Sequence, residues 1–237
     1  YNTLIMAFLY APIVVLIVFS FNGSKSRSIW NGFSLQWYEA LWADAEIREA
    51  LWVTLKVAVL SALFATVIGV LAAVGIHRLN RRLRKVFLTV NNLPMVNPEI
   101  VTGISLMLLF VFIYQSTGLL RTGFLTLLLA HITFNIPYVI LQVMPKLRQM
   151  NQHMYEAALD LGCHPLSAFF KVVMPEIMPG VTTGALMAFT MSLDDFVISY
   201  FTSGSTAQTL SVTIYNMTKR PITPEINALS TLMFGVI

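Results

Sequence analysis

Residues 57–76 read VAVLSALFATVIGVLAAVGI, and HRLNRRLRK follows directly at residues 77–85. The first stretch carries no charge and has the length of about 20 residues that a helix needs to cross the hydrocarbon core of a bilayer. The second stretch brings five cations into one short turn: Arg78, Arg81, Arg82, Arg84 and Lys85. An apolar helix that ends in a basic turn is typical of a membrane span whose basic end faces the cytoplasm.

The composition agrees with a chain that is solvated by lipid. Of the 237 residues, 57% are hydrophobic and 11% are charged, whereas about 25% of the residues in a soluble domain are charged. The formal net charge is +4. Because the cations lie in short loops between apolar stretches, we interpret them as orientation signals and lipid headgroup contacts, with no nucleic-acid partner. The single cysteine, Cys163, excludes an intrachain disulfide and a cysteine-based metal cluster.

Apolar stretches recur along the whole chain. We predict spans at residues 3–21, 57–76, 86–114, 122–144, 177–201 and 226–237. They are too long and too continuously apolar for barrel strands, so they must be helices that satisfy their own backbone polar groups. The sequence predicts an all-α polytopic membrane protein with six helices in a single domain over residues 1–237. We expect the sixth helix to be truncated, because its stretch is too short to span. We expect the first stretch to be a retained span, not a signal peptide.

The basic turn also sets the expected orientation. With residues 77–85 inside, alternation predicts a cytoplasmic N-terminus and a cytoplasmic segment 145–176, and it places the other loops outside: 22–56, 115–121 and 202–225. The first outer loop is rich in aromatic residues, which predict a belt at the membrane interface, with a site that stacks on the substrate as the alternative. These are Trp30, Trp37, Tyr38, Trp42 and Trp52.

Segment 145–176 is the longest inner segment. Its pattern predicts a short helix that ends at Gly162 and a second short helix that ends at Pro175. In the second helix, apolar residues recur at helical spacing: Leu166, Phe169, Phe170 and Val173. A short amphipathic helix of this kind lies on a membrane or enters the groove of a partner.

The same segment resembles the signature of the inner-membrane permeases of ABC importers, in which Glu-Ala-Ala, three residues, Gly and nine residues precede Ile-x-Leu-Pro. The matching residues are Glu156, Ala157, Ala158, Gly162 and Pro175, with Val172 and Met174 in place of Ile and Leu. The resemblance implies a type I importer domain and a segment that docks on an ATP-hydrolysing subunit. There Glu156 would pair with a basic residue, the two alanines would permit close approach, and Gly162 would turn the chain. The alternative is a connector that touches only lipid headgroups.

The sequence contains no phosphate-binding pattern G-x-x-x-x-G-K-[ST]. We therefore expect no cofactor in this chain and no enzymatic activity of its own, with ATP and Mg²⁺ bound by partner subunits. The four histidines show no metal-ligand spacing, which argues against a metal site and against a membrane enzyme: His77, His131, His153 and His164.

Three acids lie inside the predicted spans, where an ionisable residue indicates function. At about 1.5 Å per residue, Glu99 and the pair Asp194 and Asp195 lie at one depth, roughly 21–23 Å from the cytoplasmic side. Together they suit a pathway for a cation such as a polyamine. The alternatives are that the Asp pair caps or bonds neighbouring helices, and that Glu99 is favoured by a helix dipole after Pro98. We expect His131 and Asn135 to form hydrogen bonds between helices.

Four short stretches are similar to the spermidine/putrescine importer permeases: Asn97–Val101, His131–Phe134, Ser192–Ser199 and Pro224–Leu229. This resemblance covers nearly the whole chain. It implies a bacterial inner-membrane importer that carries polyamines and assembles from this chain, a second similar permease, two ATP-binding subunits and an extracytoplasmic substrate-binding protein. Two alternatives stay open: the same machine with another cargo, such as iron or a phosphonate, and a channel or carrier that works without ATP.

Overall fold

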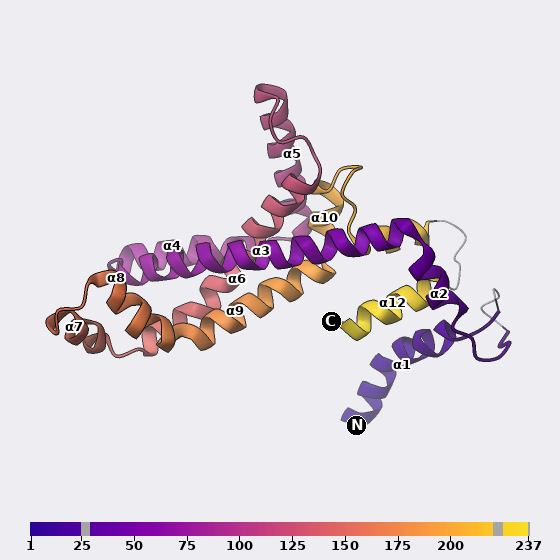
Figure 1. The fold of residues 1–237 in the computed structure, drawn as a ribbon, viewed down its shortest axis with the longest axis horizontal. Coiled ribbons are helices and arrows are strands. Elements are labelled where there is room, and N and C mark those ends of the chain that lie inside the picture. Colours follow the sequence, from indigo (N-terminus) through magenta and orange to yellow (C-terminus); the bar gives the residue numbers. More distant parts are fainter. Residues whose placement is uncertain (25–28, 220–224, 237) are drawn as a thin grey trace. The chain divides into compact units, whose positions relative to one another are not determined.

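The computed structural model describes residues 1–24, 29–219 and 225–236, and it is helical (Figure 1). The elements in chain order are α1 (Asn2–Ser20), α2 (Gln36–Ala43), α3 (Ala45–Arg78), α4 (Arg81–Val96), α5 (Glu99–Thr117), α6 (Phe124–Gln149), α7 (Gln152–Asp160), α8 (Pro165–Ala168), the π-helical turn η1 (Phe169–Val173), α9 (Met174–Asp194), α10 (Val197–Thr202), α11 (Leu210–Thr218) and α12 (Glu225–Val236). Within the described residues, extended pairing is limited to one bridge between Asn22 and Phe33. The prediction of an all-α fold is confirmed.

Among the described residues, five helical stretches are long and apolar enough to cross a membrane: Thr3–Ser20, Ala45–Arg78, Glu99–Thr117, Phe124–Gln149 and Pro165–Asp194. They confirm a polytopic membrane protein. Helix α12 has 12 residues, so a sixth span at 226–237 stays a prediction, and Ile237 lies outside the described residues.

The structure corrects the predicted span 86–114, which is two helices. Helix α4 ends at Val96, Asn97 is extended with ψ 143°, and α5 begins after Pro98. The physical reason is that a proline disfavours helical backbone at the residue before it. Pro94, by contrast, lies inside α4. Hydropathy alone does not detect this break, because the residues on both sides of it are apolar.

The predicted span 177–201 is also divided. Helix α9 ends at Asp194, Asp195 leaves the helix with ψ 123°, and α10 follows from Val197. Two other helices are longer than the predicted spans that they contain: α3 starts at Ala45, well before residue 57, and α6 continues to Gln149, beyond residue 144. A helix can continue past the part of it that crosses a membrane, so these two spans stay predictions.

Segment 145–176 is largely helical, and the prediction that Pro175 ends a helix is wrong. Pro175 lies in the first turn of α9, which η1 joins without a break. Proline is tolerated there because the first amide groups of a helix need no acceptor inside that helix. The second short helix therefore continues directly into a membrane helix.

The chain divides into two compact units, which we describe separately: Tyr1–Thr54 with Ala207–Ile237, and Leu55–Thr206. In the first unit, α1 packs on α12, and the core contains Trp37, Leu41 and Leu229. The Trp37 indole donates a hydrogen bond of 2.6 Å to the Asn22 carbonyl, so this tryptophan is a core residue and not part of an interfacial belt. Trp30, Trp42 and Trp52 are exposed, as a belt requires.

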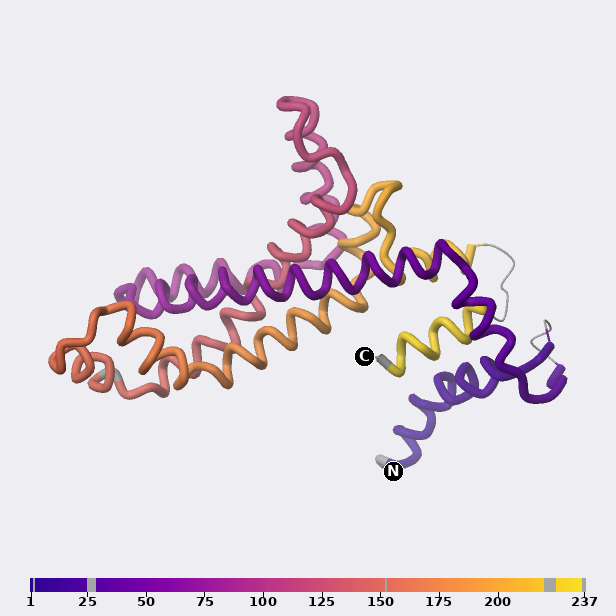
Figure 2. The backbone as a smooth tube through the Cα atoms, in the orientation of Figure 1, coloured from indigo at the N-terminus to yellow at the C-terminus, as the bar shows by residue number. Residues whose placement is uncertain are grey.

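In the second unit, α6 and α9 lie side by side (Figure 2). Small residues allow this close approach. A Cβ atom added to Gly180 would lie 2.7 Å from the Gln142 carbonyl oxygen, and one added to Gly184 would lie 3.3 Å from the Val139 Cα. Small residues at helix contacts are typical of membrane bundles, where packing replaces the hydrophobic effect as the driving force.

Candidate docking segment and membrane acids

The motif residues lie on a compact segment, residues 152–173, which we call the docking segment. Helix α7 starts where the Asn151 side chain accepts a hydrogen bond from the His153 amide. It ends in a paired cap, in which Gly162 N donates to Leu159 O and Cys163 N donates to Ala158 O. Gly162 has φ +83°, a left-handed conformation that glycine adopts without strain. The prediction of a helix that ends at Gly162 is confirmed.

Within α7, the motif residues differ in exposure. Ala158 is buried, while Glu156 and Ala157 are exposed. The Glu156 carboxylate lies 3.2 Å from the His153 imidazole, and both side chains are largely in water. Because exposed pairs of this kind are weak, Glu156 stays available to a partner. Gly162 and Pro175 are also exposed.

Large apolar side chains are exposed on the same docking segment as Glu156. Leu161, Leu166 and Phe170 are exposed by 87%, 65% and 62%, whereas Val173 is buried. The helical spacing of Leu166 and Phe170 is visible in the sequence, but Leu161 has no such signal because it follows the end of α7. Clustered exposed apolar residues mark a contact surface for protein or membrane.

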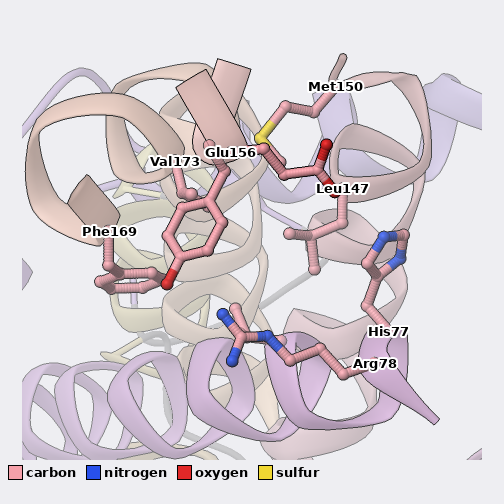
Figure 3. Close-up of a pocket in the computed structure, with 9 residues that line it drawn as sticks. His77, Arg78, Leu147, Met150, Glu156, Phe169 and Val173 are labelled. Atoms are coloured by element: carbon pink, nitrogen blue, oxygen red, sulfur yellow. The ribbon is translucent and has the colours of Figure 1, made fainter. Parts of the chain in front are cut away.

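A pocket of about 370 Å³ separates the docking segment from the ends of α3 and α6 (Figure 3). It is lined by Val74, His77, Arg78, Leu147, Met150, Tyr155, Glu156, Phe169 and Val173. The Arg78 guanidinium lies 5.5 Å from the centre of the Tyr155 ring, within cation–π range. Sequence reasoning missed this contact, because the two residues are far apart in the chain. The docking segment and the end of α3 therefore meet at one end of this unit.

Helices α3, α6, α9 and α10 share a buried polar cluster at a different place in the unit. It consists of Ser61, His131, Asn135, Ser192, Asp195 and Ser199. The Ser192 hydroxyl is its centre and lies 2.8 Å from the Ser61 hydroxyl, 3.1 Å from His131 Nδ1 and 2.7 Å from Asn135 Nδ2. The prediction that His131 and Asn135 bond between helices is confirmed. Such bonds join helices where lipid offers no alternative partner.

Asp195 belongs to this cluster. Its carboxylate accepts hydrogen bonds of 3.3 Å from the Ile198 amide and 2.7 Å from the Ser199 amide, so it caps α10. The same carboxylate lies 3.6 Å from His131 Nε2. His131 Nε2 is also 3.0 Å from the Ser199 hydroxyl. Asp195 thus follows the alternative in which one acid of the pair bonds a neighbouring helix.

Asp194 and Glu99 have a different environment from Asp195. Asp194 is the exposed last residue of α9, and Glu99 is the exposed first residue of α5, where the helix dipole favours an acid. One turn after Glu99, Gly103 allows α5 to pack on α10, since a Cβ there would lie 2.9 Å from the Phe201 ring. Helix α5, which begins at Glu99, therefore contacts α10, which Asp195 caps, and a pathway role for the three acids stays a prediction.

Among the described residues, no group of three or more His, Cys, Asp or Glu side chains is placed to hold a metal ion. Separately, the exposed carboxylates of Glu99, Glu156 and Asp194 can attract cations, and the exposed apolar side chains of the docking segment can contact a partner.

Comparison with known proteins shows that the chain is similar to two polyamine permease proteins of Escherichia coli. The chain is 41% identical over 232 residues to the putrescine transport system permease protein PotI of Escherichia coli K12, covering 97% of this chain and 83% of that protein. It is 39% identical over 233 residues to the spermidine/putrescine transport system permease protein PotC of the same strain, covering 98% of this chain and 86% of that one.

A solved structure shows the same fold. The crystal structure of a bacterial alginate ABC transporter in complex with an alginate pentasaccharide-bound periplasmic protein contains a chain with a TM-score of 0.74 and 17% identity, covering 98% of this chain and 85% of that one. The family model for the binding-protein-dependent transport system inner membrane component matches residues 65–237. This chain therefore belongs to the family of inner membrane components of binding-protein-dependent transport systems.

Proposed function

We propose that this chain is a membrane-spanning subunit of an ATP-driven importer whose cargo is a polyamine, spermidine or putrescine. The observation that supports a polyamine as the cargo is the 41% identity to a putrescine permease over 97% of the chain. The acids fit this cargo, because exposed carboxylates at Asp194 and Glu99 attract amines with several positive charges.

The proposed assembly contains this chain, a second similar permease, two ATP-binding subunits and an extracytoplasmic substrate-binding protein. The docking segment supports contact with an ATP-binding subunit, because Glu156, Leu161, Leu166 and Phe170 are all exposed on it. ATP and Mg²⁺ would be bound by that partner. The alginate transporter bound to its periplasmic protein supports a partner on the opposite face.

Movement of the docking segment would be transmitted to the membrane acids through helix α9. Because η1 joins α9 without a break, a movement of the docking segment turns or shifts a helix of 21 residues, which is about 30 Å long. The far end of that helix is Asp194. The Arg78–Tyr155 contact would move α3 together with the same segment.

The orientation is part of the proposal. The pocket places the basic end of α3 and the docking segment together, which supports a cytoplasmic location for both. Alternation from this end gives a cytoplasmic N-terminus, and the family supports a bacterial inner-membrane location.

The test is uptake by proteoliposomes that contain the purified chain with its partner permease, ATP-binding subunits and binding protein. We expect radiolabelled putrescine or spermidine to accumulate only with ATP, and unlabelled polyamine to compete. Accumulation of iron or a phosphonate without polyamine uptake would show that the chain belongs to an ATP-driven importer with a different cargo. Polyamine flux through the chain alone, without ATP, would make it a channel or carrier.

A further inference from the structure

A second pocket, of about 430 Å³, lies between α4 and α6. Its polar lining is Arg81, Arg84, Lys85, Thr89 and Asn92 from α4, with Arg148 from α6. Leu88 is the one apolar residue in its lining. We call it the basic pocket. Four of its seven lining residues are cations, and none is an acid.

These cations lack acidic partners. Within the part of the chain that the structure describes, no ion pair is found for Arg81, Arg84, Lys85 or Arg148. Arg81, Arg84 and Lys85 also fall in the first five residues of α4, where the helix dipole disfavours positive charge. The concentration of cations in the basic pocket is therefore unfavourable for the isolated chain, and an anion would relieve it.

The remainder of α4 indicates where this anion lies. Among its described residues α4 buries none, and after Lys85 it exposes apolar side chains at helical spacing: Val86, Phe87, Val90 and Leu93. The basic pocket lies on a different face of α4, where residues 81, 84, 85, 88 and 92 align. A helix with an exposed apolar face and a basic end lies in the bilayer with that end at the level of the lipid headgroups.

We propose that the basic pocket binds the phosphate of an anionic phospholipid, such as phosphatidylglycerol, between α4 and Arg148 of α6. Three arginines and a lysine surround the phosphate, and Thr89 and Asn92 provide polar side chains beside it. The lipid links the start of α4 to the end of α6, next to the docking segment. This inference needs only a chain embedded in a membrane, so it stands or falls independently of the cargo.

The experiment is native mass spectrometry of the purified full-length chain in detergent, titrated with phosphatidylglycerol or with phosphatidylcholine. The test variants are Arg84→Gln and Arg148→Gln. The matched control is Arg82→Gln, which removes the same charge from an exposed residue of the same helix outside the pocket. We expect phosphatidylglycerol to bind in preference to phosphatidylcholine. Each test variant should weaken this binding about fivefold, and the control by less than about twofold.

Three results would overturn the inference. Equal losses for Arg82→Gln and Arg84→Gln would mean diffuse attraction to the whole basic turn. Displacement of the lipid by inorganic phosphate would mean a site for free anions. Unchanged lipid binding in Arg84→Gln and Arg148→Gln would mean that the lipid does not bind in the basic pocket. Thermal melting of each variant identifies any loss of fold, and Arg84→Lys should retain lipid binding because it keeps the charge.

Discussion

Two histidine–carboxylate pairs in the same unit have opposite surroundings. His153 and Glu156 on the docking segment are 3.2 Å apart, and their side chains are 87% and 69% exposed. His131 and Asp195 are 3.6 Å apart, with side chains only 1% and 4% exposed. The exposed pair has water as its alternative partner, while the buried pair has none. The same two residue types therefore form an exposed pair in one place and a buried pair in the other.

The hydrogen bonds around each pair show the same difference. Asp195 accepts two backbone amides of α10, and His131 also contacts Ser192 and Ser199. Glu156 has no such support from α7 and is free to exchange His153 for a cation on a partner. Because exposed pairs are worth little and the loss of one buried partner costs several kcal/mol, mutations in the two pairs should separate stability from transport.

The largest effect is expected for Asp195→Ala. This change removes the cap of α10, leaves two buried amides without their acceptor and takes away the carboxylate beside His131, which keeps its contact with the Ser199 hydroxyl. We expect a loss of about 2–4 kcal/mol of stability, seen as a melting temperature lower by about 4 °C or more in detergent. The matched control is Asp194→Ala, the exposed neighbour, which should melt within about 2 °C of the unmodified chain. A similar drop for both variants would contradict the separation of the two acids.

Much of this fold follows from the sequence, and the exceptions have physical causes. Apolar length identifies the membrane helices because lipid demands it. The breaks at Asn97 and Asp195 are invisible to apolar length, since apolar residues continue on both sides. Pro98 signals the first break through its effect on the preceding residue. The second break has only the Asp pair as its signal. It depends on the Asp195 carboxylate, which accepts hydrogen bonds from the amides of Ile198 and Ser199, three and four residues further along the chain.

The sites were predictable to different degrees. The local pattern predicts helix α7 and its glycine cap at Gly162, whereas Glu156 and Ala158 stand out only through the resemblance to the permease signature. The Arg78–Tyr155 contact and the four-helix cluster around Ser192 depend on the packing of distant segments, which no local pattern encodes. Pro175 was misjudged because proline is equally common after one helix and at the start of the next.

The next largest effect is expected for Glu156→Gln, which keeps the shape of the side chain and removes its charge. If Glu156 pairs with a cation of the ATP-binding subunit, ATP-driven uptake should fall about tenfold, while the melting temperature of the isolated chain stays unchanged. The matched control is Glu176→Gln, an exposed acid in the first turn of α9 outside the motif, which should keep normal uptake. Equal losses in both variants would point to the general charge of this surface.

The smallest effect is expected for His153→Ala, and it decides how Glu156 works. If His153 is only a temporary partner of Glu156 in water, its removal should change uptake by less than about twofold and the melting temperature by less than about 2 °C. If His153 instead holds Glu156 in the orientation that the partner requires, uptake should fall nearly as far as in Glu156→Gln. The double variant distinguishes these cases: losses that add indicate independent residues, and a loss no greater than that of Glu156→Gln alone indicates one functional unit.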